Sequence, residues 1–513
     1  MQELKRLAHF VKQKCQSTLP FVDFYEAYNQ EDKLFHHLHS IDSDEAALGL
    51  LYPEATEDTH RALQSVKGRL KEKLMNSLLY IDFNRFIKTD KLIDVVMEAR
   101  LFYEEARILT YFYGDQKEAK KRFKKALAVA QRYELHTLTL DCLEFLLNPM
   151  LSKDVPPKTW KHYAKLQETT FSHYQIQFKA NQIDRDMRST LVGLHKTNST
   201  QAAKKNILEE VKEGMITLRQ LWQDSGLTRI YYRYHMFTVR YHQVLGNWQG
   251  MLDHIAQSEQ TLQEGILNEH VFNPKFGIYM KTLAYMMLRQ YQAGLAYMPY
   301  ALQHFKEEES NYFAIQLHHL LLAIRAADYP RAFKVLEKKE ILHNFRNVSQ
   351  KMQEEWYMAE AYLQFITESE PLHFQTIYDH VPVMRADKEG MNLNLLILQL
   401  LLLLRAGELL HFERTFHNSF RALKRLPAKK RGKADTFFRL LHHLIKQDYH
   451  PARTRDAARH LVDKLEAIEP GIISSNYEIV PYSRLWSYTL GLLERLPVKV
   501  ERGEGVNVGV VGR

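Results

Sequence analysis

The 513-residue chain contains few of the residues that cross-link, interrupt or loosen a fold. It has two cysteines, Cys15 and Cys142, which are too few for a disulfide framework or a thiolate metal site and are typical of a reducing compartment. Its 20 glycines and 15 prolines are scarce for this length, and 45% of the residues are hydrophobic. The composition therefore predicts a folded cytoplasmic protein without extended disorder.

Long hydrophobic runs are also missing. The most apolar stretch, residues 393–404, is interrupted by Asn394 and Gln399 and is followed by Arg405. As a helix it would span about 18 Å, well short of the roughly 30 Å of a bilayer core. The first residues carry charges at Lys5 and Arg6 where an export signal needs an apolar core. We expect a buried helix at 393–404 and no membrane partner.

Charge of one sign is in only slight excess. The 70 basic and 61 acidic residues give a formal net charge of +9. This is a mild preference for acidic partners and lacks the concentrated basic character of a nucleic-acid-binding domain.

Catalytic and metal-binding motifs are absent from the sequence. There is no Gly-x-Ser-x-Gly and no His-Glu-x-x-His, and adjacent histidines such as His318 and His319 would point about 100° apart on a helix. The one glycine-rich segment, 503–509, is not followed by the helix that a phosphate-binding loop requires. We therefore expect no enzymatic activity, no cofactor and no metal site.

What the chain does contain is a repeated tight turn between two helical patterns. The turns are centred on six polar residues whose spacings are 43, 38, 40, 40 and 40, namely Asn247, Gln290, Asp328, Glu368, Glu408 and Asp448. Such regularity is typical of stacked helical hairpins, each of which cannot bury its apolar face alone. The sequence predicts an all-α fold, a right-handed α-solenoid with a step of about 40 residues.

A further hairpin pattern near the N-terminus turns at Gly114-Asp115 and continues with Ala119-x3-Phe123-x2-Ala126-Leu127. This motif resembles the second helix of a tetratricopeptide repeat, in which a small residue allows close approach and an aromatic residue seals the next helix. The first helix departs from the family pattern, with Tyr103 at the Trp position and Arg107 at the Gly position. The resemblance implies a scaffold that binds a protein or peptide.

Breaks in the helical pattern predict five sections. Residues 1–90 form a divergent N-terminal helical module, 91–150 a hairpin plus a helix, and 151–227 long helices that begin after Pro156-Pro157. Residues 228–497 form the hairpin array with a closing helix. Residues 498–513 alternate Val with Gly and Glu, and we expect a disordered tail there.

The first candidate ligand-binding residues lie on the predicted helix 229–245. Arg229, Arg233 and Arg240 follow one stripe at i, i+4 and i+11. Like charges at i, i+4 destabilise a helix by roughly 0.2–0.5 kcal/mol, so this stripe requires acidic partners, either from neighbouring helices or from an acidic ligand. Tyr231 is the aromatic residue that we expect to bind a ligand beside them.

The second candidate is a basic segment, residues 424–433, with six cations in ten residues. Pro427 and Gly432 argue against one uniform helix, so we expect a loop centred on Lys429, Lys430 and Arg431. It is either a solvated connection or a contact for phosphate or an acidic surface. A third basic run, between Lys117 and Lys125, is expected to be the solvated face of its helix.

Taken together, these features predict a non-enzymatic scaffold that binds a protein or peptide, of acidic character, in a concave groove lined by the first helices of its hairpins. The alternative is an RNA-binding helical-repeat protein, in which basic stripes neutralise phosphates and aromatic residues stack on bases. Binding of RNA would weaken steeply with salt, whereas a peptide interface of modest charge would weaken far less.

Overall fold

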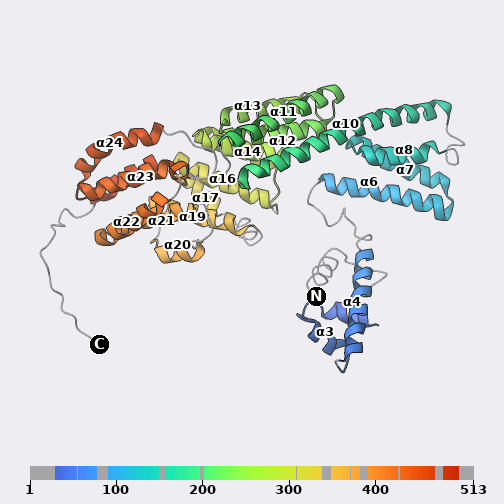
Figure 1. The fold of residues 1–513 in the computed structure, drawn as a ribbon, viewed down its shortest axis with the longest axis horizontal. Coiled ribbons are helices and arrows are strands. Elements are labelled where there is room, and N and C mark those ends of the chain that lie inside the picture. Colours follow the sequence, from blue (N-terminus) through green and yellow to red (C-terminus); the bar gives the residue numbers. More distant parts are fainter. Residues whose placement is uncertain are drawn as a thin grey trace. The chain divides into compact units, whose positions relative to one another are not determined.

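The computed structural model describes residues 29–54, 56–77, 91–148, 156–196, 201–307, 309–337, 348–369, 371–381, 391–425, 428–467 and 478–495. Throughout these ranges the regular secondary structure is helical, which confirms the all-α prediction (Figure 1). The segment predicted to be a disordered tail, 498–513, lies outside them. None of the helices described is long and apolar enough to cross a membrane. The apolar stretch 393–404 belongs to α21 (Met391–Arg405), whose Leu395, Leu398 and Leu401 are fully buried.

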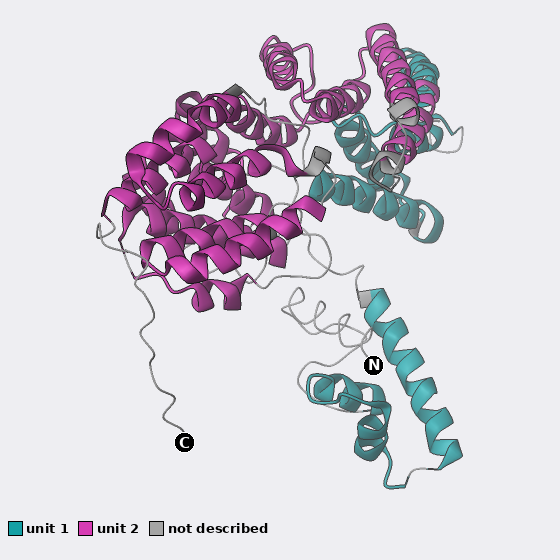
Figure 2. Cartoon of the chain, turned by 60° about the vertical axis from the view of Figure 1, so that its left-hand side comes forward, with its two compact units in different colours: residues 1–174 teal, residues 175–513 magenta. Residues whose placement is uncertain are grey.

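The chain divides into two compact units, Met1–Tyr174 and Gln175–Arg513 (Figure 2). The division falls inside the long helix α10 (Pro157–Lys196). That helix begins at the second of the two prolines, where the missing amide hydrogen costs nothing because the first amides of a helix have no intrahelical acceptor.

In the first unit, α2 (Gln30–His37), α3 (Asp44–Leu51) and α4 (Glu57–Ser77) bury a cluster of their own that includes Phe35 and Leu70. A separate cluster joins α6 (Lys91–Ile108), the π-helical turn η2 (Leu109–Tyr113), α7 (Gln116–Arg132) and α8 (His136–Leu147). There Ala106 of α6 and Ala119 of α7 are fully buried, and Phe123 stacks on Phe145 of α8 with 4.7 Å between ring centroids.

The second unit contains the rest of α10 and a succession of shorter helices. They are α11 (Gln201–Ser225), α12 (Thr228–Leu245), α13 (Trp248–Gln263), α14 (Lys275–Met287), α15 (Tyr291–Gln303), α16 (Ser310–Ala326), α17 (Tyr329–Leu336), α19 (Gln350–Thr367), α20 (Phe374–His380), α21, α22 (Leu409–Arg425), α23 (Ala428–Lys446), α24 (Pro451–Ala467) and α25 (Tyr482–Arg495). Most helices contact the next one, and the alternate helices α12, α14, α16, α19 and α21 also contact one another in succession. The closing helix predicted near the end of the chain is α25.

Each of the six predicted turns contains a residue in the left-handed backbone region: Gly246, Arg289, Ala327, Glu368, Gly407 and Asp448, with φ between 47° and 73°. At Ala327 the following amide, of Asp328, donates to the carbonyl oxygen of Ala323 at 2.9 Å, which closes the end of α16. The Asp328 carboxylate then accepts from the Arg331 amide at 3.3 Å and begins α17. Two residues therefore end one helix and start the next.

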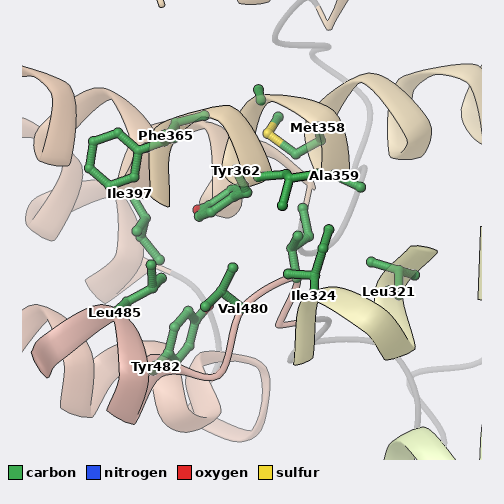
Figure 3. Packing of buried hydrophobic residues seen from close by; sticks show 14 of the residues in the cluster. Leu321, Ile324, Met358, Ala359, Tyr362, Phe365, Ile397, Val480, Tyr482 and Leu485 are labelled. Atoms are coloured by element: carbon green, nitrogen blue, oxygen red, sulfur yellow. The ribbon is translucent and has the colours of Figure 1, made fainter. Parts of the chain in front are cut away.

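The largest buried cluster extends without a break from Ile278 in α14 to Leu493 in α25. Figure 3 shows part of it, where Tyr362 and Phe365 of α19, Ile397 of α21 and Leu485 of α25 point toward one another. The Tyr362 hydroxyl donates to the carbonyl oxygen of Asn394 at 2.8 Å, so this buried polar group is satisfied. Side chains thus fill the space between α16, α19, α21 and α25.

Candidate functional site

Three sides of helix α12 pack against other helices, and its arginines lie on the fourth side. Ile230 and Phe237 pack with residues of α10 and α11, and Val239 packs with α13 and α14. By the helical period, Arg229, Arg233 and Arg240 occupy the remaining face. We define the arginine face as Arg188 of α10, Arg233 and Arg240 of α12, and Phe276 of α14.

Arg233 has its side-chain partners on α10. Its guanidinium donates to the amide oxygen of Asn181 and to the carbonyl oxygen of Arg229 (3.3 Å), and its Nε lies 4.0 Å from the Asp184 carboxylate. Burial lowers the pKa of Arg233, and Asp184 opposes that shift. A neighbouring helix therefore supplies the acidic partner of Arg233, which is the first of the two alternatives that the sequence left open.

Asp184 is shared, because it also accepts two hydrogen bonds from Arg188, at 2.9 and 3.1 Å. Arg188 lies over the ring of Phe237, with 5.8 Å between Cζ and the ring centroid. Arg240 is exposed and lies over Phe276 at 5.5 Å, and it forms no ion pair with any carboxylate in the described ranges. Two guanidinium groups thus share one carboxylate, and the third, that of Arg240, lies over an aromatic ring.

The prediction that Tyr231 binds a ligand is not supported by its position, because the side chain is buried, with 3% of the residue exposed. Its hydroxyl donates to Ser258 Oγ at 2.8 Å, and its ring packs against Trp222 and Phe272. Tyr231 is two positions from Arg233, so the two side chains point about 200° apart around the helix. Its ring is therefore part of the core.

Next to the Tyr231 hydroxyl, the buried side chains of His235 and Ser258 resemble a catalytic pair. His235 Nδ1 is 2.9 Å from Ser258 Oγ, but the Ser258 hydroxyl donates to the carbonyl oxygen of His254 at 2.9 Å. His235 must therefore donate through Nδ1, so it cannot accept the serine proton. Burial lowers the pKa of His235 to about 3 and that of His254 to about 4. The arrangement stabilises the core and does not activate Ser258.

The basic segment 424–433 differs from the predicted loop, because α23 already begins at Ala428. Gly432, with φ 44° and ψ −137°, interrupts the helix, a conformation that a residue with a Cβ adopts only under strain. Lys424 pairs with Asp435 at 2.6 Å, and Lys433 is buried against Glu478 at 3.5 Å. The structure describes the backbone of Lys429 and Lys430 but not their side chains, and Arg431 is half-buried. The cations at the two ends of this segment, Lys424 and Lys433, therefore form ion pairs within the protein.

The Cys142 thiol and the potential metal ligands are the remaining reactive groups in the described ranges. Burial raises the pKa of the Cys142 thiol to about 12, so little nucleophilic thiolate forms at neutral pH. In the parts of the chain that the structure describes, no three His, Cys, Asp or Glu side chains are arranged to hold a metal ion.

The environment of Glu478 was not predicted from the sequence. This residue meets Lys433 through its carboxylate, and its carbonyl oxygen accepts a hydrogen bond from Arg325 of α16. The only local signal is an acidic residue just before the apolar run Ile479-Val480. Its partners are remote in sequence, so no periodicity could have revealed them.

Comparisons with protein-family models, with curated proteins and with solved structures find no significant match for this chain. The tetratricopeptide resemblance therefore rests on sequence motifs alone, of which 119–127 is the clearest.

Proposed function

We propose that this chain is a non-enzymatic cytoplasmic scaffold in which helical hairpins stack as a right-handed α-solenoid, and that the arginine face binds an acidic segment of a partner protein. The succession of contacts between alternate helices supports the stacking. The observation that carries the binding function is the sharing of one carboxylate, Asp184, by Arg188 and Arg233, beside an exposed Arg240 that pairs with no carboxylate among the described residues.

The arginine face is chemically suited to a partner segment that carries carboxylates beside an apolar side chain. Guanidinium groups form charge-assisted hydrogen bonds with carboxylates, often through two parallel bonds. Each exposed ion pair contributes only about 0.2–1 kcal/mol, so apolar contact has to provide most of the affinity. Phe276 offers that contact, and the partly buried Tyr279, Leu283 and Met287 continue from it along one side of α14.

Reversal of the charge at Arg240 tests this proposal. Arg240→Glu removes the exposed cation and leaves the contacts of Arg233 and Arg188 with Asp184 intact, so folding should be preserved. Lys124→Glu is the matched control, because Lys124 is an exposed cation on α7, in the other compact unit. Each protein is used as bait in the lysate of its native cell, with and without nuclease, and captured proteins are identified by mass spectrometry.

The proposal predicts partners that survive nuclease treatment, are lost with Arg240→Glu and are retained with Lys124→Glu. Release of all captured material by nuclease would favour the RNA-binding alternative. Equal loss with both variants would show that the capture depends on net charge and not on the arginine face.

A further inference from the structure

The segment 478–495 lies against α24 and against the first helices of four earlier hairpins, α16, α19, α21 and α23. Ile479, Val480, Tyr482 and Leu485 are each at most 2% exposed and belong to the cluster that contains residues of α16, α19 and α21. Figure 3 shows Val480, Tyr482 and Leu485 beside Ile324, Tyr362 and Ile397. The segment therefore buries apolar side chains against these first helices, and α25 also contacts α24, with an ion pair between Arg455 and Glu494 at 2.7 Å.

Polar contacts fix this segment at both ends. At its start, Glu478 is held by Lys433 of α23 and Arg325 of α16, and the Arg484 guanidinium donates to the carbonyl oxygen of Ile324 at 2.9 Å. That carbonyl is near the end of α16, where a cation is favourable. Toward its end, Tyr488 and Arg495 each donate to the Glu368 carboxylate at 2.7 Å.

We propose that the segment 478–495 is an internal ligand, which occupies the face of α16, α19, α21 and α23 and keeps out of it a partner's amphipathic helix preceded by an acidic residue. The inference rests on the proposed function in treating the first helices as a ligand-binding face. It extends that function to a second face, one that the chain itself inhibits.

The mode of contact is that of a bound peptide. An acidic residue meets buried cations, a short segment ending at Pro481 follows, and an amphipathic helix then buries Leu485, Leu492 and Leu493. This is the helix-in-groove mode, with an ionic contact that sets the register. Lys433 and Arg325 thus bind Glu478 as they would bind an acidic residue of a partner, but here the acidic residue belongs to the same chain.

An exchange experiment on the full-length chain tests the inference. The probe is a fluorescein-labelled peptide of residues 478–495, and binding is followed by fluorescence anisotropy. Leu485→Ala/Leu493→Ala weakens the internal segment without altering the face that it covers. We expect the variant to bind the peptide at least about tenfold more tightly than the parent, which is about 1.4 kcal/mol. A peptide carrying Glu478→Lys should bind the variant about tenfold more weakly, because it places a cation against Lys433.

Hydrogen exchange of the parent chain provides a second measurement that does not depend on the variant. If the segment opens by itself, the amides of α25 exchange at least about tenfold faster than those of α16 and α21. Exchange of all three helices at one rate, or a folded variant that gains no affinity for the peptide, overturns the inference. None of the residues of the arginine face lies in α16–α25, so failure here is distinguishable from failure of the capture experiment.

Discussion

A difference of two positions along α12 decides whether a side chain is buried or reaches the surface. Arg233 and Arg240 lie on the stripe that the sequence predicts, whereas Tyr231 points into the core. The sequence could identify the stripe because helical periodicity is local. The same periodicity places Tyr231 about 200° from Arg233, but which residues bury it depends on the helices that flank α12. For the same reason it could not show that Arg233 pairs with α10.

Three buried histidines make stability depend on pH. Burial lowers the pKa of His235 to about 3, of His254 to about 4 and of His318 to about 3. The unfolded chain, with a histidine pKa near 6.5, binds more protons below that pH, so stability is lost as pH falls from about 6.5 toward these folded values. Between pH 7 and 5 each histidine should lower the free energy of unfolding by about 2 kcal/mol.

Urea unfolding at pH 7, 6 and 5 checks this expectation. A His318→Gln variant should lose less stability than the parent over the same range, because it lacks one of the titrating groups. An unfolding midpoint that stays constant from pH 7 to 5 would contradict the burial of these three imidazoles.

Phe123 tests the N-terminal hairpin. It is fully buried between α6, α7 and α8, where Phe123→Asp would place an unpaired carboxylate and remove an aromatic contact. Loss of the ring alone typically costs about 3–5 kcal/mol, and the buried charge adds to it. The melting temperature of Phe123→Asp should therefore be much lower than that of the parent. Lys124→Asp, at the exposed neighbouring position, should have little effect on the melting temperature. If both variants melt like the parent, Phe123 does not contribute to a core.

At the level of elements, the turns are the feature that the sequence predicted best. A polar residue after a short break in the apolar pattern marks each one, and the structure places a left-handed residue in all six. Two of these residues are glycines, Gly246 and Gly407, which adopt this conformation without a Cβ clash. The other four positions could not be inferred from residue type, because Arg, Ala, Glu and Asp rarely adopt a positive φ.

Ala327 offers a direct test of such a turn, since it has φ 60° between α16 and α17. Ala327→Gly removes the strain of a left-handed alanine, about 1–2 kcal/mol, and loses part of that gain to the larger entropy of the unfolded chain. We expect a net stabilisation of about 0.5–1 kcal/mol, measured as a higher urea midpoint. Ala326→Gly, one residue earlier and inside the helix, should instead lower the midpoint. A lower midpoint for Ala327→Gly as well would mean that the turn is not left-handed.

For the whole molecule, composition and periodicity were sufficient to predict an all-helical chain. Circular dichroism should accordingly give more than about half helix, against roughly a third for an average globular protein. The contacts of α25 with helices far earlier in the chain were not predictable in this way. The hydrogen bond from Arg484 to Ile324, for example, joins residues 160 positions apart, and only the folded arrangement brings them together.

Site-specific photo-cross-linking at the arginine face tests the central claim, that this face binds an acidic partner protein. Phe276→p-benzoylphenylalanine places the photoreactive group beneath Arg240, and Tyr378→p-benzoylphenylalanine on α20 is the control at a second, partly exposed aromatic residue. Irradiation in the native lysate should give a protein adduct from position 276 that resists nuclease and disappears when Arg240→Glu is added. The control position should give no such adduct. Adducts of equal yield from both positions, or an adduct at 276 made of nucleic acid, would contradict the account.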